Sequence, residues 1–201
     1  MKNTTDIISN PWFEYMDDLS GGDKVINYSL GGKKRGFSKV EKRYYKSVFR
    51  EIDELTGITF VKTKRREANI RIIPIEDITD DTRLELFDHD HDHSVTTEYL
   101  PVSSEDAVMG RASPYTDKVK LFIKDNDSIV TSVEKYVILH EIGHSLGLGH
   151  PDGNGSNPEF TSEDTVMSYN LQDSWFFGDQ YYTELDQQAL TQLWGINDTS
   201  M

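Results

Sequence analysis

Three histidines and one glutamate within an eleven-residue stretch form the strongest chemical pattern in this sequence. On a helix, His140 and His144 lie one turn apart, so both imidazoles point from the same face and can bind one metal ion. Glu141 lies beside them, where its carboxylate can accept a proton from a water molecule on that ion. Gly147 can adopt the left-handed conformation that ends the helix, which returns His150 to the ion as a third ligand. Three histidine ligands leave one tetrahedral position of zinc open for water, as in catalytic sites.

The pattern gains its specificity from its full length. The short motif H-E-x-x-H occurs by chance in many helices, where two such histidines are more often surface decoration. The complete string H-E-x-x-H-x-x-G-x-x-H adds a helix-ending glycine and a third ligand at fixed spacing. The sequence therefore predicts one zinc ion held by His140, His144 and His150, with Glu141 as the general base.

A second motif, T-V-M-S-Y at residues 165–169, resembles the methionine turn of the metzincin zinc proteases. By this resemblance Met167 forms an apolar floor below the histidines, whereas a lone methionine would be interpreted as a core residue that fills a gap. The proline directly after His150 and the Trp-Gly pair at 194–195 are most similar to the catalytic domains of serralysins and matrixins. In serralysins the tyrosine two positions after the methionine reaches the zinc or the reaction's oxyanion, so Tyr169 is the candidate for that role. The alternative is an ordinary core or surface tyrosine.

The resemblance implies a metzincin-like α+β fold. Its N-terminal lobe, about residues 23–149, would hold a twisted, mixed five-stranded sheet and two long helices. Its C-terminal lobe, about residues 150–201, would be small and irregular and would end in a helix. We expect one catalytic domain over residues 1–201, of which residues 1–22 are an N-terminal extension.

The implied activity is that of a zinc-dependent metalloendopeptidase, in which a metal-activated water molecule hydrolyses peptide bonds with Glu141 as general base. The alternative is a catalytically weak metzincin-like fold that serves as a zinc-containing binding or structural module. Retention of Glu141 favours the enzyme, because a binding module does not need the base.

The expected substrate is an extended peptide or protein. By the same resemblance, the strand at 107–112 should be the exposed edge above the cleft, which pairs antiparallel with the peptide main chain. The residues concerned are Val108, Met109, Gly110, Arg111 and Ala112. The alternative is an ordinary covered strand.

Carboxylates and imidazoles alternate at residues 88–93. They are Asp88, His89, Asp90, His91, Asp92 and His93. Matrixins bind a structural zinc through a His-x-Asp pair and two later histidines, but this sequence has no histidine between His93 and His140. We therefore interpret the run as a solvated acidic loop, with a second metal site as the alternative.

Hydrophobic periodicity predicts the elements that position these motifs. Strands are expected at 24–30, 58–61, 69–73, 107–112 and 118–124. Helices are expected after three capping boxes, Ser38 with Glu41, Thr131 with Glu134, and Thr183 with Asp186, and before three terminating glycines, Gly57, Gly147 and Gly195. The second helix carries the first two histidines. Residues 76–106 are acidic and lack periodicity, so we expect a long loop.

The charge balance excludes several classes of function. With 21 Lys and Arg against 35 Asp and Glu, the formal net charge is −14, which argues against nucleic acid as a partner. An acidic surface also suits hard cations, so calcium is a second candidate ion. The sequence contains no cysteine, which excludes disulfides, thiolate metal sites and a cysteine nucleophile.

The sequence predicts no membrane partner, because none of its windows approaches the apolar length of a membrane span. The N-terminus has no apolar run of the length that a secretory signal needs, so we expect an intracellular protein or one secreted by a leaderless route. We expect a monomer.

Overall fold

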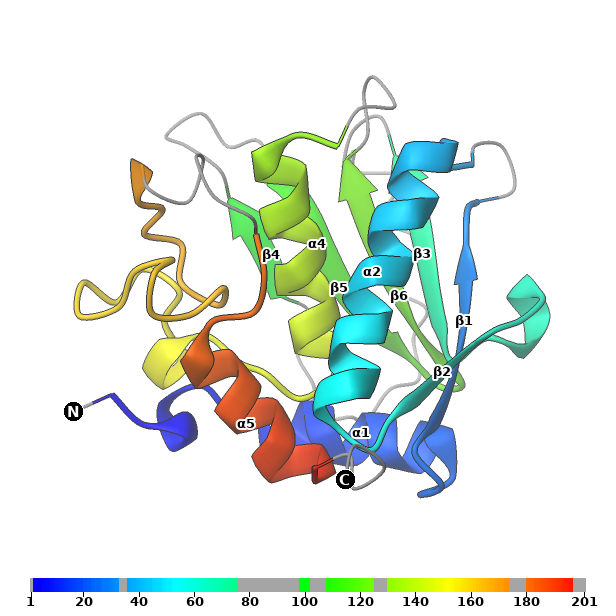
Figure 1. The fold of residues 1–201 in the computed structure, drawn as a ribbon, viewed down its shortest axis with the longest axis horizontal. Coiled ribbons are helices and arrows are strands. Elements are labelled where there is room, and N and C mark those ends of the chain that lie inside the picture. Colours follow the sequence, from blue (N-terminus) through cyan, green and yellow to red (C-terminus); the bar gives the residue numbers. More distant parts are fainter. Residues whose placement is uncertain are drawn as a thin grey trace.

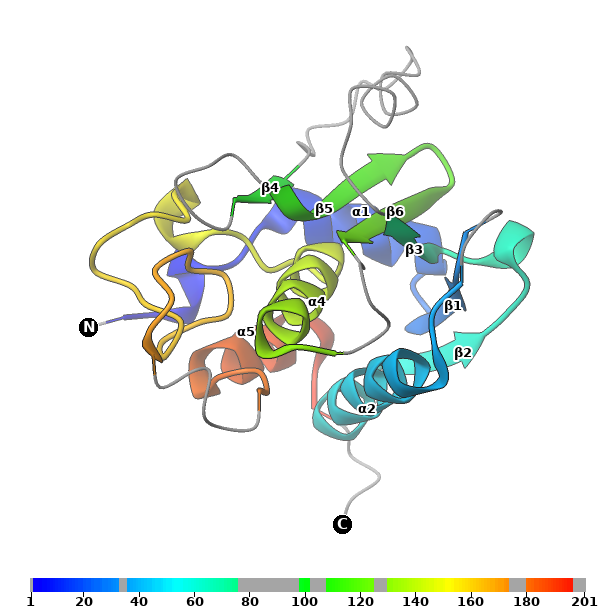
Figure 2. The same ribbon diagram turned by 90° about the horizontal axis from the view of Figure 1, so that it is seen from above.

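The computed structural model describes residues 2–32, 36–75, 98–101, 108–124, 130–173 and 180–196. The fold is α+β, with a mixed sheet whose one face is covered by two long helices (Figures 1 and 2). Two shorter helices lie together at one end of the sheet, at the bottom of Figure 1. This architecture confirms the expected fold class.

The sheet contains all five expected strands and one more. In spatial order it runs β2 (Thr59–Lys62), β1 (Val25–Leu30), β3 (Ile70–Ile75), β6 (Lys118–Lys124), β5 (Val108–Tyr115) and β4 (Glu98–Pro101). The first four strands in this order are parallel, and β5 is antiparallel to both of its neighbours. The extra strand, β4, lies in the segment that was expected to be a loop.

The described residues form four α-helices: α1 (Asn10–Ser20), α2 (Lys39–Leu55), α4 (Ser132–Ser145) and α5 (Glu184–Trp194). The three predicted capping boxes are present, with Ser38, Thr131 and Thr183 each accepting a hydrogen bond from the backbone N–H three residues on. Short 3₁₀ turns occur at Thr4–Asp6, Arg65–Glu67 and Pro151–Gly153.

Helix α4 is the central element of the core. Every residue from Tyr136 to Ser145 is buried, because β5 and β6 cover one side of the helix and the C-terminal segments cover the other. A helix buried all round can hold polar groups away from bulk water, which suits a metal site. No helix in the described ranges is long and apolar enough to cross a membrane.

Residues 2–22 contribute side chains to the hydrophobic core. Helix α1 buries Trp12, Tyr15 and Met16 in the same hydrophobic cluster as the sheet and α4. These positions follow the helical period, and Pro11 stands at the start of the helix, where its missing N–H costs nothing. The segment that was expected as an N-terminal extension thus contributes to the core.

Several predictions concern residues outside the described ranges. They include the Asp-His run at 88–93 and nearly all of the loop around it. A second metal site there therefore remains a prediction. Calcium binding and the monomeric state also remain predictions.

Candidate metal centre

The structure brings the three predicted histidine ligands together. His140 and His144 project from α4 and are fully buried, and His150 follows the turn at Gly147. One candidate ligand atom from each histidine lies within 4.8 Å of the others, and no other such group occurs among the described residues. Gly147 has φ +100°, the left-handed conformation that was expected of it.

The geometry of the imidazoles fits a tetrahedral metal ion. The Nε2 atoms of His140 and His150 are 3.3 Å apart. Two nitrogens that each lie about 2.0–2.1 Å from a tetrahedral zinc ion are separated by about 3.3–3.4 Å. The Nε2 atom of His144 is buried and has no hydrogen-bond partner within the described structure, as expected for an atom that needs a metal. The residues present therefore fit the ion.

Backbone carbonyls orient two of the rings. His140 Nδ1 lies 2.7 Å from the carbonyl oxygen of Val166, and His144 Nδ1 lies 3.0 Å from that of Leu148. A carbonyl only accepts, so each Nδ1 carries the proton and each Nε2 offers its lone pair to the metal. Burial also lowers the pKa of both rings well below its ordinary value, and that of His150 to about 4, which keeps all three neutral.

Glu141 lies where β5 passes close to α4. The carboxyl group is fully buried, and a Cβ atom built on Gly110 would come within 2.7 Å of its Oε1. Only a glycine allows the strand backbone to approach so closely. Gly110 therefore helps to fix the position of the predicted general base.

The methionine turn lies under the histidines, as the resemblance implied. Met167 is fully buried, and its sulfur would be 2.9 Å from a Cβ built on Gly143, which lies between the first two ligands on α4. The turn itself is held by Asp186, which accepts hydrogen bonds from Thr165 Oγ1 at 2.5 Å and from the Val166 N–H at 3.0 Å. Sequence reasoning treated Asp186 only as a helix cap, and its capping position gave no sign of this second role.

Tyr169 lies beside the third ligand. Its hydroxyl oxygen is 2.8 Å from His150 Nε2, the ring nitrogen that faces the other ligands. The phenol ring packs on Gly155, where a Cβ atom would come within 2.5 Å of the ring. The close packing holds the hydroxyl at the metal centre, which is the location the serralysin resemblance requires.

The N-terminal segment holds the loop that carries His150, which sequence reasoning missed. The Ser9 N–H donates to the carbonyl of Gly147, and the Gly149 N–H donates to the carbonyl of Ile7, both at 2.8 Å. These bonds form an antiparallel bridge between residues 7–9 and 147–149. The Trp12 ring is also stacked on the ring of His144, with centroids 6.4 Å apart.

The predicted substrate-binding edge is already paired. Strand β4 forms an antiparallel ladder with β5, in which Glu98 is opposite Ala112 and Pro101 is opposite Val108. In the described structure residues 108–112 therefore have β4 as their neighbour on this side of the sheet. Pairing of this strand with a substrate stays a prediction.

The comparisons agree with this geometry. No curated protein matches the chain. The matrixin family model matches residues 22–173, which include the three predicted ligands, the predicted general base, the methionine turn and the sheet. That match covers most of the sequence, and the chain therefore belongs to the matrixin family.

Proposed function

We propose that this protein is a zinc-dependent metalloendopeptidase. The observation that carries the proposal is the triad of neutral imidazoles, of which His140 and His144 are fully buried, with the His140 and His150 Nε2 atoms spaced as a tetrahedral zinc site requires and Glu141 beside them. A purely structural zinc site would have four protein ligands. Membership of a protease family supports the same conclusion.

The chain's own groups account for the hydrolytic steps. A bound zinc ion supplies a Lewis acid and brings the pKa of a water molecule to near 7. The Glu141 carboxylate accepts the proton of that water molecule and later gives it to the leaving amine. The Tyr169 hydroxyl donates a hydrogen bond to the carbonyl oxygen as negative charge develops on it. No acyl-enzyme is formed, because water is the nucleophile.

Substrate binding involves β5 in this proposal. Protease substrates bind in extended form and add a strand to an exposed sheet edge. Because β4 pairs with residues 108–112, an extended peptide must displace β4 to form the same ladder. Gly110 of β5 approaches Glu141 closely, so a peptide paired with this strand would lie near the base.

Cleavage of a denatured protein mixture, with and without a chelator, tests the activity and its metal dependence. Mapping of the cut sites gives the preference of the subsites. The Glu141→Ala variant should retain zinc and lose cleavage, because the base is not a ligand. The matched control is Glu159→Ala, which removes an exposed glutamate after the third ligand. Cleavage by Glu141→Ala at the parental rate would show that the assigned mechanism is wrong.

A further inference from the structure

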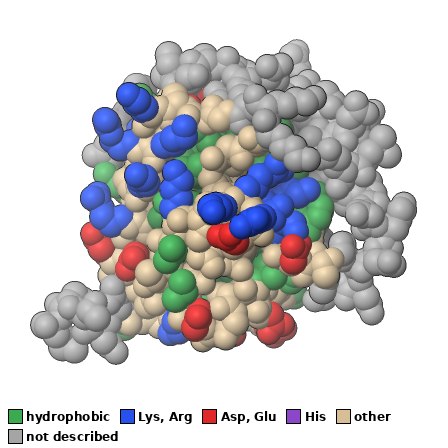
Figure 3. All heavy atoms as spheres, turned by 90° about the vertical axis from the view of Figure 1, so that its right-hand side faces the viewer, with side chains coloured by type: hydrophobic (Ala, Val, Ile, Leu, Met, Phe, Trp, Pro, Cys, Tyr) green, Lys and Arg blue, Asp and Glu red, His purple; other side chains and the backbone are tan. Residues whose placement is uncertain are grey.

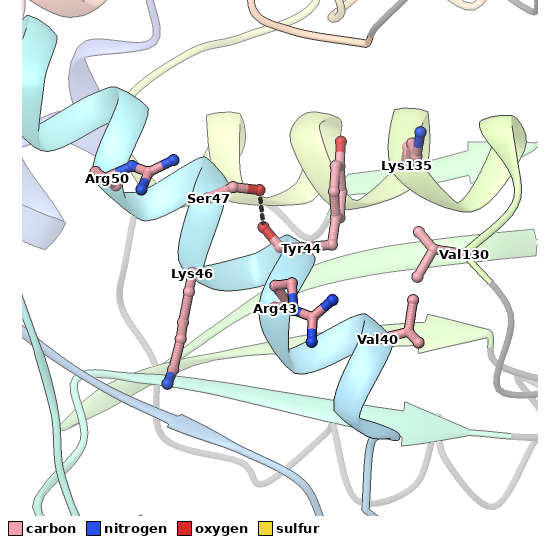
Figure 4. Close-up of a pocket in the computed structure, with 8 residues that line it drawn as sticks. All are labelled: Val40, Arg43, Tyr44, Lys46, Ser47, Arg50, Val130 and Lys135. Carbon is pink, nitrogen blue, oxygen red and sulfur yellow. Dashed lines mark hydrogen bonds between the residues drawn. The ribbon is translucent and has the colours of Figure 1, made fainter.

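Helices α2 and α4 enclose a groove on the helical side of the sheet (Figure 4). Its volume is about 740 Å³. The lining residues are Val40, Arg43, Tyr44, Lys46, Ser47 and Arg50 from α2, with Lys135 from the first turn of α4 and Val130 from just before that helix. None of them belongs to the metal centre, so this groove has no role in the chemistry described above.

Four cations line the groove. Arg43, Lys46 and Lys135 form no ion pair with any carboxylate in the described ranges. Arg50 contacts Glu54 at 3.7 Å, but both side chains are 73% exposed, and such a pair contributes little. Arg43 and Arg50 are two helical turns apart, which places them about 10 Å apart along α2. Lys135 lies across the groove from them (Figure 4).

The cations of the groove belong to a larger basic face. Residues 33–71 contain 13 of the 21 Lys and Arg of the chain but only 5 of its 35 Asp and Glu. On the face shown in Figure 3, Lys and Arg gather over the upper and middle part, and the Asp and Glu side chains lie mainly below them. Although the net charge of the chain is −14, residues 33–71 are strongly basic and the rest of the chain is strongly acidic. The potential of such a molecule steers an acidic partner to the basic face and away from the rest of the surface.

The floor of the groove is apolar. Val40 is 56% exposed and lies with Val130 beside the ring of Tyr44. Tyr44 is the one aromatic residue among the eight that line the groove, and the Lys135 ammonium lies 5.7 Å from its ring centroid. An apolar floor between cations suits a peptide that carries both carboxylates and aliphatic side chains. Single-stranded nucleic acid would instead need open aromatic faces for its bases to stack on.

A second hollow of about 310 Å³ continues the groove and shares Tyr44, Ser47, Arg50 and Lys135 with it. This end is also lined by Glu51 and Glu54, which repel carboxylates. The acidic part of a bound chain would therefore occupy the first hollow, whose lining includes Arg43, Arg50 and Lys135 but neither glutamate.

We propose that the groove between α2 and α4 binds an acidic peptide segment of a partner protein. The peptide's carboxylates pair with Arg43, Arg50 and Lys135, and an aliphatic side chain packs on Val40 and Val130. Charge complementarity and an apolar floor together select this chemistry. The proposal does not depend on the proposed protease activity, because the groove contains no residue of the metal centre.

Fluorescence polarisation with a labelled peptide of about eight residues, rich in Asp and Glu with one Val and one Leu, tests the proposal. The zinc-loaded Glu141→Ala protein is used so that the probe stays intact. The same peptide with Asn and Gln in place of Asp and Glu should bind at least about tenfold more weakly. Measurable binding of the acidic probe needs no catalytic step, so this assay can fail while the protease assay succeeds, and the reverse.

Two charge reversals of equal size locate the site. Arg43→Glu with Arg50→Glu should weaken binding at least about tenfold, whereas Lys62→Glu with Lys64→Glu should change it less than about twofold. Lys62 and Lys64 are exposed cations of the same basic face, outside the groove. Lys135→Glu changes the opposite wall and should weaken binding at least about threefold. If the double variant of α2 does not fold, Lys135→Glu still tests whether the groove binds the peptide.

Three outcomes would overturn the proposal. Equal losses in the two double variants would mean that the whole basic face attracts anions without a site. Displacement of the probe by a single-stranded oligonucleotide at lower concentration than by unlabelled acidic peptide would identify nucleic acid as the ligand. If the Glu141→Ala protein with an unaltered groove did not bind the acidic probe with a Kd of about 100 μM or tighter, no peptide site would exist.

Discussion

The pairing of the N-terminal segment with the His150 loop predicts that truncation weakens zinc binding. Removal of residues 2–9 deletes the two backbone hydrogen bonds that join residues 7–9 to Gly147 and Gly149, each 2.8 Å long. A hydrogen bond of this kind contributes about 0.5–1.5 kcal/mol net. The two bonds together stabilise the loop that carries the predicted third ligand by about 1–3 kcal/mol. If their loss lowers the free energy of zinc binding by the same amount, zinc binds about 5- to 150-fold more weakly.

The assay is a zinc titration of the metal-free protein against a chromophoric chelator of known affinity. A shorter deletion, of residues 2–6, is the matched control. It removes the contacts of Lys2 with Asp164 and of Thr4 with Gln192 but retains the pairing at 7–9. We expect the control to bind zinc within about threefold of the full chain. If both deletions bound zinc as tightly as the full chain, the N-terminal segment would have no role in positioning His150.

Three further predictions concern single residues. Gly110→Ala should retain zinc but lower kcat about 100-fold, because the added Cβ displaces the Glu141 carboxylate by a fraction of an ångström or more. Tyr169→Phe should lower kcat about 100-fold with a small change in KM, as expected for a hydrogen bond made mainly in the transition state. Burial, reinforced by Glu54 and Asp186 and opposed by a hydrogen bond from the Tyr182 backbone, raises the pKa of Glu51 from 4.5 to about 7. The folded state then binds the Glu51 proton more tightly than the unfolded state does. Protonation of Glu51 therefore stabilises the fold fully below pH 4.5, and this stabilisation is lost as pH rises to about 7. Thermal unfolding should show Glu51→Gln to be more stable than the parent by about 1–2 kcal/mol near pH 8 and nearly equal to it near pH 4.

Each of these predictions has a control of similar chemistry. Gly36→Ala adds a Cβ where no described atom lies within 4 Å, and it should leave kcat unchanged. Tyr181→Phe alters an exposed tyrosine away from the metal centre. Glu54→Gln alters an exposed carboxyl one turn from Glu51.

Parental kcat in Gly110→Ala or in Tyr169→Phe would remove that residue from the proposed mechanism. A stability difference between Glu51→Gln and the parent that is the same at both pH values would contradict the raised pKa of Glu51.

Local signals were sufficient to predict most of the fold and the ligands. Three capping boxes determined where α2, α4 and α5 begin, because each box satisfies backbone N–H groups within four residues of sequence. The spacing of the histidine string likewise reflects one helix and one turn. These are short-range interactions, which a sequence displays directly.

The remaining features depend on contacts between segments far apart in the chain. The role of Gly110 follows from its approach to Glu141 on another element, and that of Asp186 from its bonds to a turn twenty residues earlier. Helix α1 was overlooked because polar residues flank its short apolar stripe. Strand β4 has only four residues, too few for an alternating pattern to be recognised.

The bonds of Asp186 to the methionine turn also bear on how the metal centre forms during synthesis of the chain. Domains form as the chain leaves the ribosome, from the N-terminus onward. The residues that bind the metal are all synthesised before Asp186, but the turn below them is not fixed until its carboxylate arrives. The predicted metal centre therefore becomes complete only when α5 has emerged, so a nascent chain lacks the finished site while it is still partly folded.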